Sequence, residues 1–130
     1  MATNPGRLLL VDDEPALLKL MSVYLTRRGY AVEAVASTDA AWALAQADPD
    51  GFSAVVLDGS MAGMASTELA IRMLRGNPAV RVIATSGYPA DLSGVHAAAP
   101  GRAVFLPKPF TPEMLATLVE KVLGAQEEGV

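Results

Sequence analysis

The stretch Phe52-Ser53-Ala54-Val55-Val56-Leu57-Asp58 is a short apolar run that ends in a carboxylate. A run of about six residues suits a buried strand, and an aspartate has little reason to follow such a strand unless it takes part in chemistry. Three other apolar runs occupy residues 8–11, 80–84 and 103–106. They are followed, in turn, by Asp12-Asp13, by Thr85-Ser86-Gly87 and by Pro107-Lys108-Pro109.

These four strand ends bring together three carboxylates, a hydroxyl group and an amine. In a parallel α/β sheet the carboxyl ends of the strands lie side by side, in the crevice where ligands bind. Carboxylate oxygens are the ligands that hard divalent cations prefer, and a lysine amine binds phosphate as a point charge. The pattern therefore predicts a divalent-metal and phosphoryl site.

The composition excludes several other classes of protein. The chain has 130 residues, which suits one domain, and no apolar run approaches the length of a membrane span. It has no cysteine, one histidine and a net charge of −4 without a basic stripe, which argues against disulfides, zinc sites and direct nucleic-acid binding. We find no signal-peptide pattern and expect a cytoplasmic protein that does not contact a membrane.

Strand and helix patterns alternate along the whole chain. We expect strands at 7–11, 30–36, 52–57, 80–84 and 102–106. The first helix should end at Arg28-Gly29, the second should be capped by Thr38, and the third should cover 66–75. Residues 89–99 are the weakest helix candidate, because Gly94 interrupts them.

The last helix has the clearest start signals. Thr111 is a suitable N-cap and Pro112 suits the first helical position. We expect the helix to end at Gly124 and to bury Met114, Leu115, Leu118, Val119 and Val122. Five βα units with short connections predict an α/β fold whose doubly wound parallel sheet is covered on both faces. The domain would span 1–124, with a tail at 125–130.

The order of these motifs resembles the receiver domain of two-component response regulators. The matching residues are Asp12-Asp13-Glu14, Asp58, Ser86-Gly87 and Lys108-Pro109, and the resemblance covers nearly the whole chain. It implies a flavodoxin-like (βα)5 fold with strand order 2-1-3-4-5 and Mg²⁺ as the cofactor. It also implies that a histidine kinase or a histidine phosphotransfer protein supplies a phosphoryl group.

The chemistry of phosphoryl transfer explains the residue types. An aspartate can attack phosphorus only if the repulsion between the carboxylate and the phosphoryl oxygens is neutralised. Asp12 and Asp13 would hold the metal ion, and Asp58 would be both a metal ligand and the nucleophile. Lys108 would contact the phosphoryl oxygens, and the hydroxyl of Ser86 would donate a hydrogen bond to one of them.

Further roles follow from the resemblance alone. The carbonyl of Ser60 would complete the metal ligands, and the Lys108-Pro109 peptide bond would be cis. Ser86 rather than Thr85 would be the switch hydroxyl, because a small residue follows it and Lys108 stands 22 residues later. Phe105 would swing inward when Ser86 moves, and the face formed by 89–99, the fifth strand and the last helix would bind a partner or a second copy of the chain.

The chain departs from the family pattern after the nucleophile. The common pattern is Asp-x-x-Met-Pro-x-Met-x-Gly, whereas here Ala62 replaces the proline and Ser66 the glycine. An alternative function is a Mg²⁺-dependent phosphohydrolase with an aspartyl-phosphate intermediate. Such enzymes usually place a second carboxylate two residues after the nucleophile, where this chain has Ser60. A receiver excised from a hybrid histidine kinase is another alternative.

Overall fold

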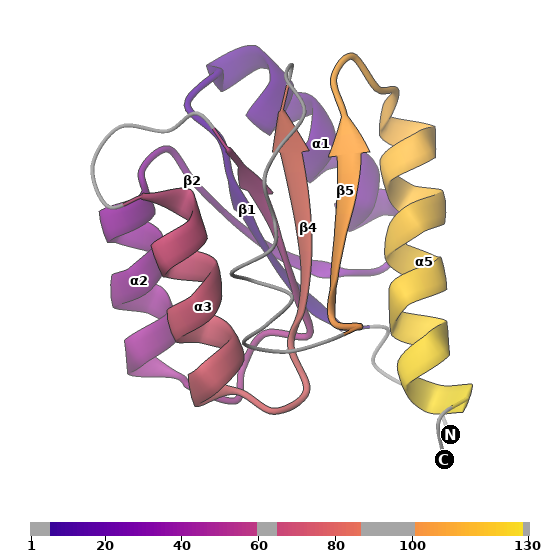
Figure 1. Ribbon diagram of the computed structural model, residues 1–130. Coiled ribbons are helices and arrows are strands. Elements are labelled where there is room, and N and C mark those ends of the chain that lie inside the picture. Colours follow the sequence, from indigo (N-terminus) through magenta and orange to yellow (C-terminus); the bar gives the residue numbers. More distant parts are fainter. Residues whose placement is uncertain (1–5, 60–64, 87–100, 129–130) are drawn as a thin grey trace.

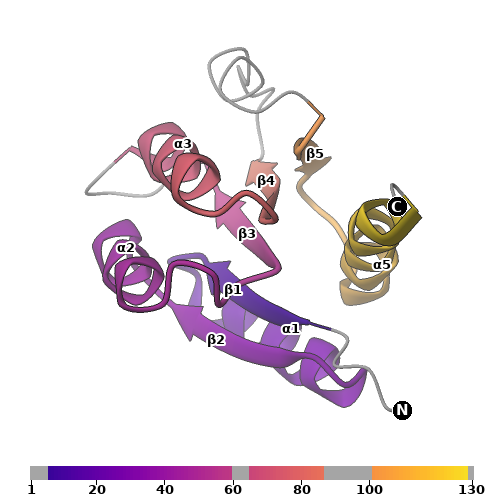
Figure 2. The same cartoon turned by 90° about the horizontal axis from the view of Figure 1, so that it is seen from below.

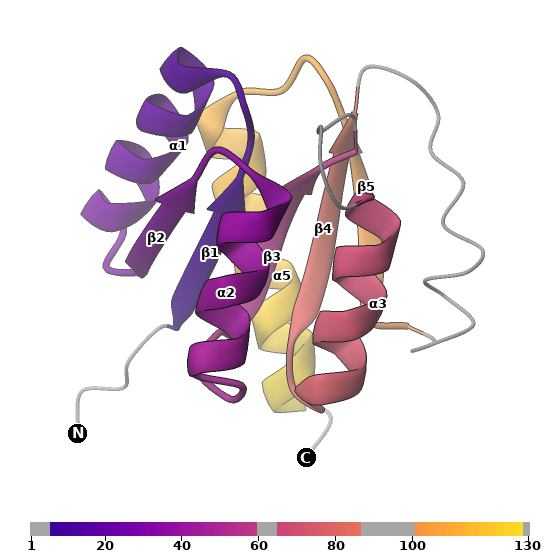
Figure 3. The same ribbon diagram turned by 90° about the vertical axis from the view of Figure 1, so that its left-hand side faces the viewer.

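Five parallel strands form the centre of the structure, in the order β2-β1-β3-β4-β5 (Figure 1). The computed structural model describes residues 6–59, 65–86 and 101–128. The strands are β1 (Arg7–Val11), β2 (Ala31–Val35), β3 (Ala54–Asp58), β4 (Arg81–Ser86) and β5 (Ala103–Pro107). Their arrowheads point the same way in Figure 3, so their carboxyl ends share one edge of the sheet. The predicted fold and strand order are confirmed.

Helices cover both faces of this sheet (Figure 2). α1 (Pro15–Arg27) and α5 (Pro112–Glu128) lie on one face, and α2 (Thr38–Ala47) and α3 (Ser66–Gly76) lie on the other. The helix expected at 89–99 lies outside the described residues. The chain is therefore a three-layer structure with the sheet in the middle.

The core divides into two clusters because neighbouring residues of a strand point to opposite faces. Leu9 and Val55 pack with residues of α2 and α3. Leu8 and Val56 pack with residues of α1 and α5. Since both faces are covered, β1, β3 and β4 contain continuous apolar runs rather than alternating ones.

Several strands end later than the sequence indicates. β3 includes Asp58 and β4 continues to Ser86, beyond the expected ends at Leu57 and Ala84. Backbone pairing continues where the apolar run stops, because Asp58 pairs with Thr85 and Ser86 pairs with Pro107. The predicted site residues thus belong to the sheet itself, which fixes their backbones.

The expected cap of the second helix is wrong. Ser37, not Thr38, is the N-cap of α2, and its Oγ accepts a hydrogen bond from the Ala40 N–H at 3.1 Å. Ser37 has the extended backbone that an N-cap requires. Thr38 is instead the first residue of the helix and is fully buried.

The start of the last helix is confirmed and its end is corrected. The Thr111 Oγ1 accepts a hydrogen bond from the Met114 N–H at 3.1 Å. The helix passes through Gly124 and reaches Glu128, because one internal glycine costs only about 1 kcal/mol relative to alanine. Met114 is 48% exposed, since it lies about 100° around the helix from Leu115, which is buried.

Candidate functional site

Three carboxylates converge at the carboxyl edge of the sheet, as predicted. Asp12 follows β1 and Asp58 ends β3, and each is almost fully buried, with 2% and 3% exposure. Asp13 is exposed. One ligand oxygen from each residue lies within 4.8 Å of the others. The two buried carboxylates come from adjacent strands because β1 pairs with β3.

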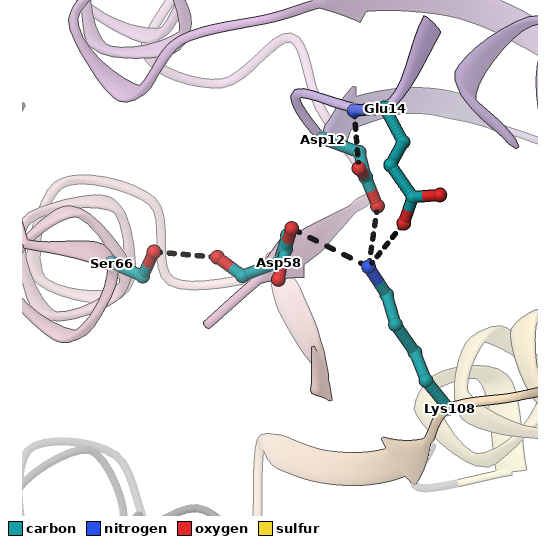
Figure 4. Close-up of polar contacts among 5 residues, drawn as sticks. All are labelled: Asp12, Glu14, Asp58, Ser66 and Lys108. Atoms are coloured by element: carbon teal, nitrogen blue, oxygen red, sulfur yellow. Dashed lines mark hydrogen bonds and ion pairs between the residues drawn. The ribbon is translucent and has the colours of Figure 1, made fainter. Parts of the chain in front are cut away.

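Lys108 provides the positive charge at this cluster (Figure 4). Its Nζ lies 3.2 Å from an oxygen of Asp12, 3.4 Å from one of Asp58 and 3.4 Å from one of Glu14. Lys108 follows β5 and precedes a cis peptide bond to Pro109, which confirms the predicted isomer. The amine thus reaches across the end of the sheet to residues at the carboxyl ends of β1 and β3.

The pKa values of two groups reflect this crowding. Burial, together with repulsion from Asp58, raises the pKa of Asp12, although the Glu14 N–H and Lys108 both stabilise the carboxylate. Burial disfavours the charged form of Lys108, but its contacts with Asp12, Asp58 and Glu14 outweigh this and raise its pKa. The site therefore holds a protonated amine against the Asp12 carboxylate, whose negative charge is costly.

The donor set fits Mg²⁺. Asp12, Asp13 and Asp58 supply oxygen atoms only, which is the chemistry that Mg²⁺ prefers. One lysine faces the three aspartates and Glu14, so negative charge is in excess, and a divalent cation would reduce it. Ser60, the fourth expected ligand, lies outside the described residues.

The hydroxyl expected to act as the switch lies beside the residue that follows Asp58. A Cβ atom placed on Gly59 would be 3.9 Å from the Ser86 Oγ. Thr85 has the opposite orientation, because Ile83 on its side of β4 packs with α1 and α5, whereas Val82 on the Ser86 side packs with α2 and α3. Both residues are buried.

Phe105 lies on the same face of the sheet as Ser86. It pairs with Ala84, two residues before Ser86 in the alternation of β4. Phe105 is half-buried and borders an open hollow of about 520 Å³ against α5, which Leu106, Met114 and Leu118 also line. The two residues expected to move together are therefore close in register.

Two contacts at the site were not predicted from the sequence. The hydroxyl of Ser66 donates a hydrogen bond to the backbone carbonyl of Asp58 at 2.6 Å (Figure 4). The carboxylate of Glu14, which belongs to the acidic motif after β1, contacts Lys108. Both contacts depend on side-chain directions between different elements, and the sequence carries no periodic signal for such directions.

Comparison with known proteins identifies the family. The model of the response regulator receiver domain matches residues 8–120. The chain belongs to this family. It is 31% identical over 123 residues to the transcriptional regulatory protein GlrR of Escherichia coli K12 and 32% identical over 125 residues to the sensor kinase CckA of Brucella abortus. It covers 27% and 13% of the lengths of these two relatives.

Solved receiver domains have the same fold. A CheY-like receiver domain protein from Methanospirillum hungatei superimposes with a TM-score of 0.81 at 28% identity. The match covers 95% of this chain and 98% of the Methanospirillum chain. The receiver domain of the hybrid histidine kinase CckA gives a TM-score of 0.76, also at 28% identity. The match covers 91% of this chain and 99% of the CckA chain.

Membership of the family carries a general function. Receiver domains act in phosphorylation-dependent signalling, bind Mg²⁺ in an acidic pocket and interact with histidine kinases or phosphotransfer proteins. They are signalling switches and generally not turnover enzymes.

Within the described residues, we find no helix that is both long and apolar enough to cross a membrane.

Proposed function

We propose that this receiver domain accepts a phosphoryl group on Asp58 and thereby acts as a signalling switch. The observation that carries the proposal is the convergence of Asp12, Asp13, Asp58 and Lys108 at one edge of the sheet. The donor would be a phosphohistidine of a histidine kinase or a histidine phosphotransfer protein. An oxygen of Asp58 attacks phosphorus, the new O–P bond forms as the P–N bond breaks, and the imidazole nitrogen keeps the electron pair.

The other residues of the cluster lower the cost of this step. When bound, Mg²⁺ supplies positive charge that offsets the repulsion between the Asp58 carboxylate and the phosphoryl oxygens. Asp12 and Asp13 would hold the ion together with Asp58, and the Ser60 carbonyl would complete the protein ligands. Lys108 already lies 3.4 Å from an oxygen of Asp58. A phosphoryl group bonded to that carboxylate therefore forms within reach of the amine.

The signal would leave the site through Ser86 and Phe105. The Ser86 hydroxyl would donate a hydrogen bond to the phosphoryl group, and Phe105 would move inward on the same face of the sheet. Phe105 is half-buried and lines the same hollow as the exposed Met114 of α5. A change in its position alters the surface offered by β5 and α5. This face, with the segment that precedes β5, would bind a partner or a second copy of the chain in its phosphorylated form.

Incubation with acetyl phosphate and Mg²⁺ tests the phosphoacceptor proposal. Intact-mass spectrometry should show the addition of one phosphoryl group to the wild type and none to Asp58→Asn. Removal of Mg²⁺ with a chelator should abolish labelling of the wild type. Equal labelling of both proteins would refute the assignment, and many turnovers of acetyl phosphate per protein would point to the phosphohydrolase instead.

The same switch can be tested at the output face. Beryllium fluoride mimics a phosphoryl group, so with Mg²⁺ it should shift amide signals of β5 and the start of α5 as well as those of the site. Changes confined to residues near Asp58 and Lys108 would refute the proposed route through Phe105.

A further inference from the structure

The peptide unit between Asp58 and Gly59 is held at both of its polar ends. Its carbonyl, which belongs to Asp58, accepts the 2.6 Å hydrogen bond from the Ser66 hydroxyl (Figure 4). Its N–H, which belongs to Gly59, donates a hydrogen bond to the backbone carbonyl of Thr85 at 2.7 Å. Residues of α3 and β4 therefore form hydrogen bonds to opposite sides of one planar peptide.

These two hydrogen bonds matter because the peptide connects Asp58 to the chain that follows it. Asp58 precedes it and carries the proposed nucleophile, and Ser60, whose carbonyl would bind the metal ion, stands one residue beyond Gly59. Glycine has more backbone freedom than other residues, so Gly59 on its own leaves the direction of the chain weakly determined. Fixing the peptide plane at both ends limits rotation on either side of it and so defines the direction in which the chain leaves Asp58.

Ser66 is well placed to hold this peptide, and it does not occupy the N-cap position of α3. It is the first residue of α3, whose N-cap, Ala65, makes no side-chain cap hydrogen bond. The Ser66 side chain is directed out of the helix to the Asp58 carbonyl and is buried there. The family pattern has glycine at this position, and a glycine has no hydroxyl to donate. The hydrogen bond is therefore a feature of this chain rather than of the pattern.

We propose that Ser66 is a positioning residue for phosphoryl acceptance, holding the Asp58–Gly59 peptide and with it the backbone that carries the Asp58 carboxylate. This inference rests on the proposed phosphoacceptor role of Asp58. The hydroxyl does not touch the reacting atoms; it acts through the backbone of the nucleophile. The net free-energy contribution of one hydrogen bond corresponds to a change of roughly three- to tenfold in an equilibrium constant or a rate constant.

Three substitutions of the full chain test the inference. Ser66→Ala removes the hydroxyl while favouring the helix, since alanine is a better helix former than serine. Ser66→Gly introduces the residue of the family pattern, and Ser66→Thr retains a hydroxyl. We expect the alanine and glycine variants to accept the phosphoryl group from acetyl phosphate roughly three- to tenfold more slowly than the wild type at saturating Mg²⁺, and Ser66→Thr to keep a rate close to the wild type.

A second readout does not depend on activity. Loss of the Ser66 hydrogen bond frees one end of the peptide, so amide hydrogen exchange at Gly59 should accelerate by a similar factor in the alanine and glycine variants. Ser37→Ala is the matched control, because it also removes a serine hydroxyl at the start of a helix but far along the chain from Asp58. It should leave both the rate of phosphorylation and the exchange at Gly59 unchanged.

The results separate this inference from the proposed function. Absence of labelling in the wild type would refute the function of Asp58 itself. If the wild type is labelled on Asp58, two outcomes overturn the role of Ser66: a wild-type rate with unchanged Gly59 exchange in Ser66→Ala, or equal losses in Ser66→Ala and Ser66→Thr. Slow labelling and fast Gly59 exchange in Ser66→Ala and Ser66→Gly, but not in Ser66→Thr, would support the role of Ser66.

Discussion

Removal of Asp13 should separate the metal response from the rest of the fold. Asp13 is the exposed member of the carboxylate cluster, so Asp13→Ala changes the charge of the site with little effect on packing. Without metal, the substitution relieves repulsion from Asp12 and Asp58. With metal, it removes a proposed ligand. We therefore expect Asp13→Ala to be as stable as the wild type or slightly more stable in metal-free buffer, and to respond little to Mg²⁺.

The size of both effects can be worked out from the structure. Two like charges at 4.8 Å, the upper limit of the spacing between these ligand oxygens, repel by about 3.5 kcal/mol at an effective dielectric constant of 20. Because Asp13 is exposed, solvent screening reduces the gain on removing it to about 1 kcal/mol or less. Mg²⁺ at ten times its Kd stabilises the wild type by about 1.4 kcal/mol. For a chain of 130 residues this raises the Tm by about 5 °C.

Thermal unfolding followed by circular dichroism provides the assay, with and without millimolar magnesium chloride at constant ionic strength. Asp50→Ala is a suitable control, because Asp50 is also exposed but precedes β3, at the opposite edge of the sheet from Asp58. The control should keep the full response to Mg²⁺. The reasoning is refuted if the Tm of the wild type does not change with Mg²⁺, or if Asp13→Ala retains the wild-type shift.

Three further predictions concern Lys108, Asp12 and Ser86. Lys108→Ala should lower the free energy of unfolding in metal-free buffer by about 3 kcal/mol, because it leaves buried carboxylates without their cation, and urea denaturation that shows no loss would contradict this. The pKa of Asp12 is raised above 3.8, so in the pH range just above that value Asp12 binds a proton more readily in the folded state than in the unfolded state. As pH increases through this range, the contribution of Asp12 to the free energy of unfolding therefore falls. Over the same range the affinity of the site for Mg²⁺ rises, because the carboxylate becomes free to bind the ion. Calorimetric titration across that range checks the affinity, and Asp12→Asn should flatten the profile; a wild-type affinity independent of pH would count against it. Ser86→Ala should still be phosphorylated on Asp58 but should lose most amide shifts at Phe105 on addition of beryllium fluoride; a full response would assign the signal to another route.

The fold could be predicted because its signals are local. Apolar runs of strand length are separated by glycine, proline and polar residues, and the runs of β1, β3 and β4 are buried on both faces. The ends of the strands were harder to place, because Asp58 and Ser86 are polar and end the apolar run, whereas backbone pairing continues through them. The prediction that Met114 is buried is wrong, because two adjacent apolar residues of a helix do not point to the same face and Leu115 is the one that faces the core.

The site was predictable to the extent that it depends on topology. Parallel strands place the residues at their carboxyl ends side by side, so the positions of Asp12, Asp58 and Lys108 in the chain sufficed to bring them together. The contacts of Glu14 and Ser66 depend instead on which way a side chain turns between two elements. Residue type and spacing do not determine that direction, which is set by the packing of the folded chain.

Chemical trapping of the phosphorylated residue is the most direct test of the central claim. Borohydride reduces an acyl phosphate and converts the labelled aspartate into homoserine, which tandem mass spectrometry locates in a peptide digest. After incubation with acetyl phosphate and Mg²⁺, we predict homoserine at position 58 and at no other aspartate. Homoserine at position 12 or 13, or none at any position, would contradict the assignment of Asp58 as the phosphoacceptor.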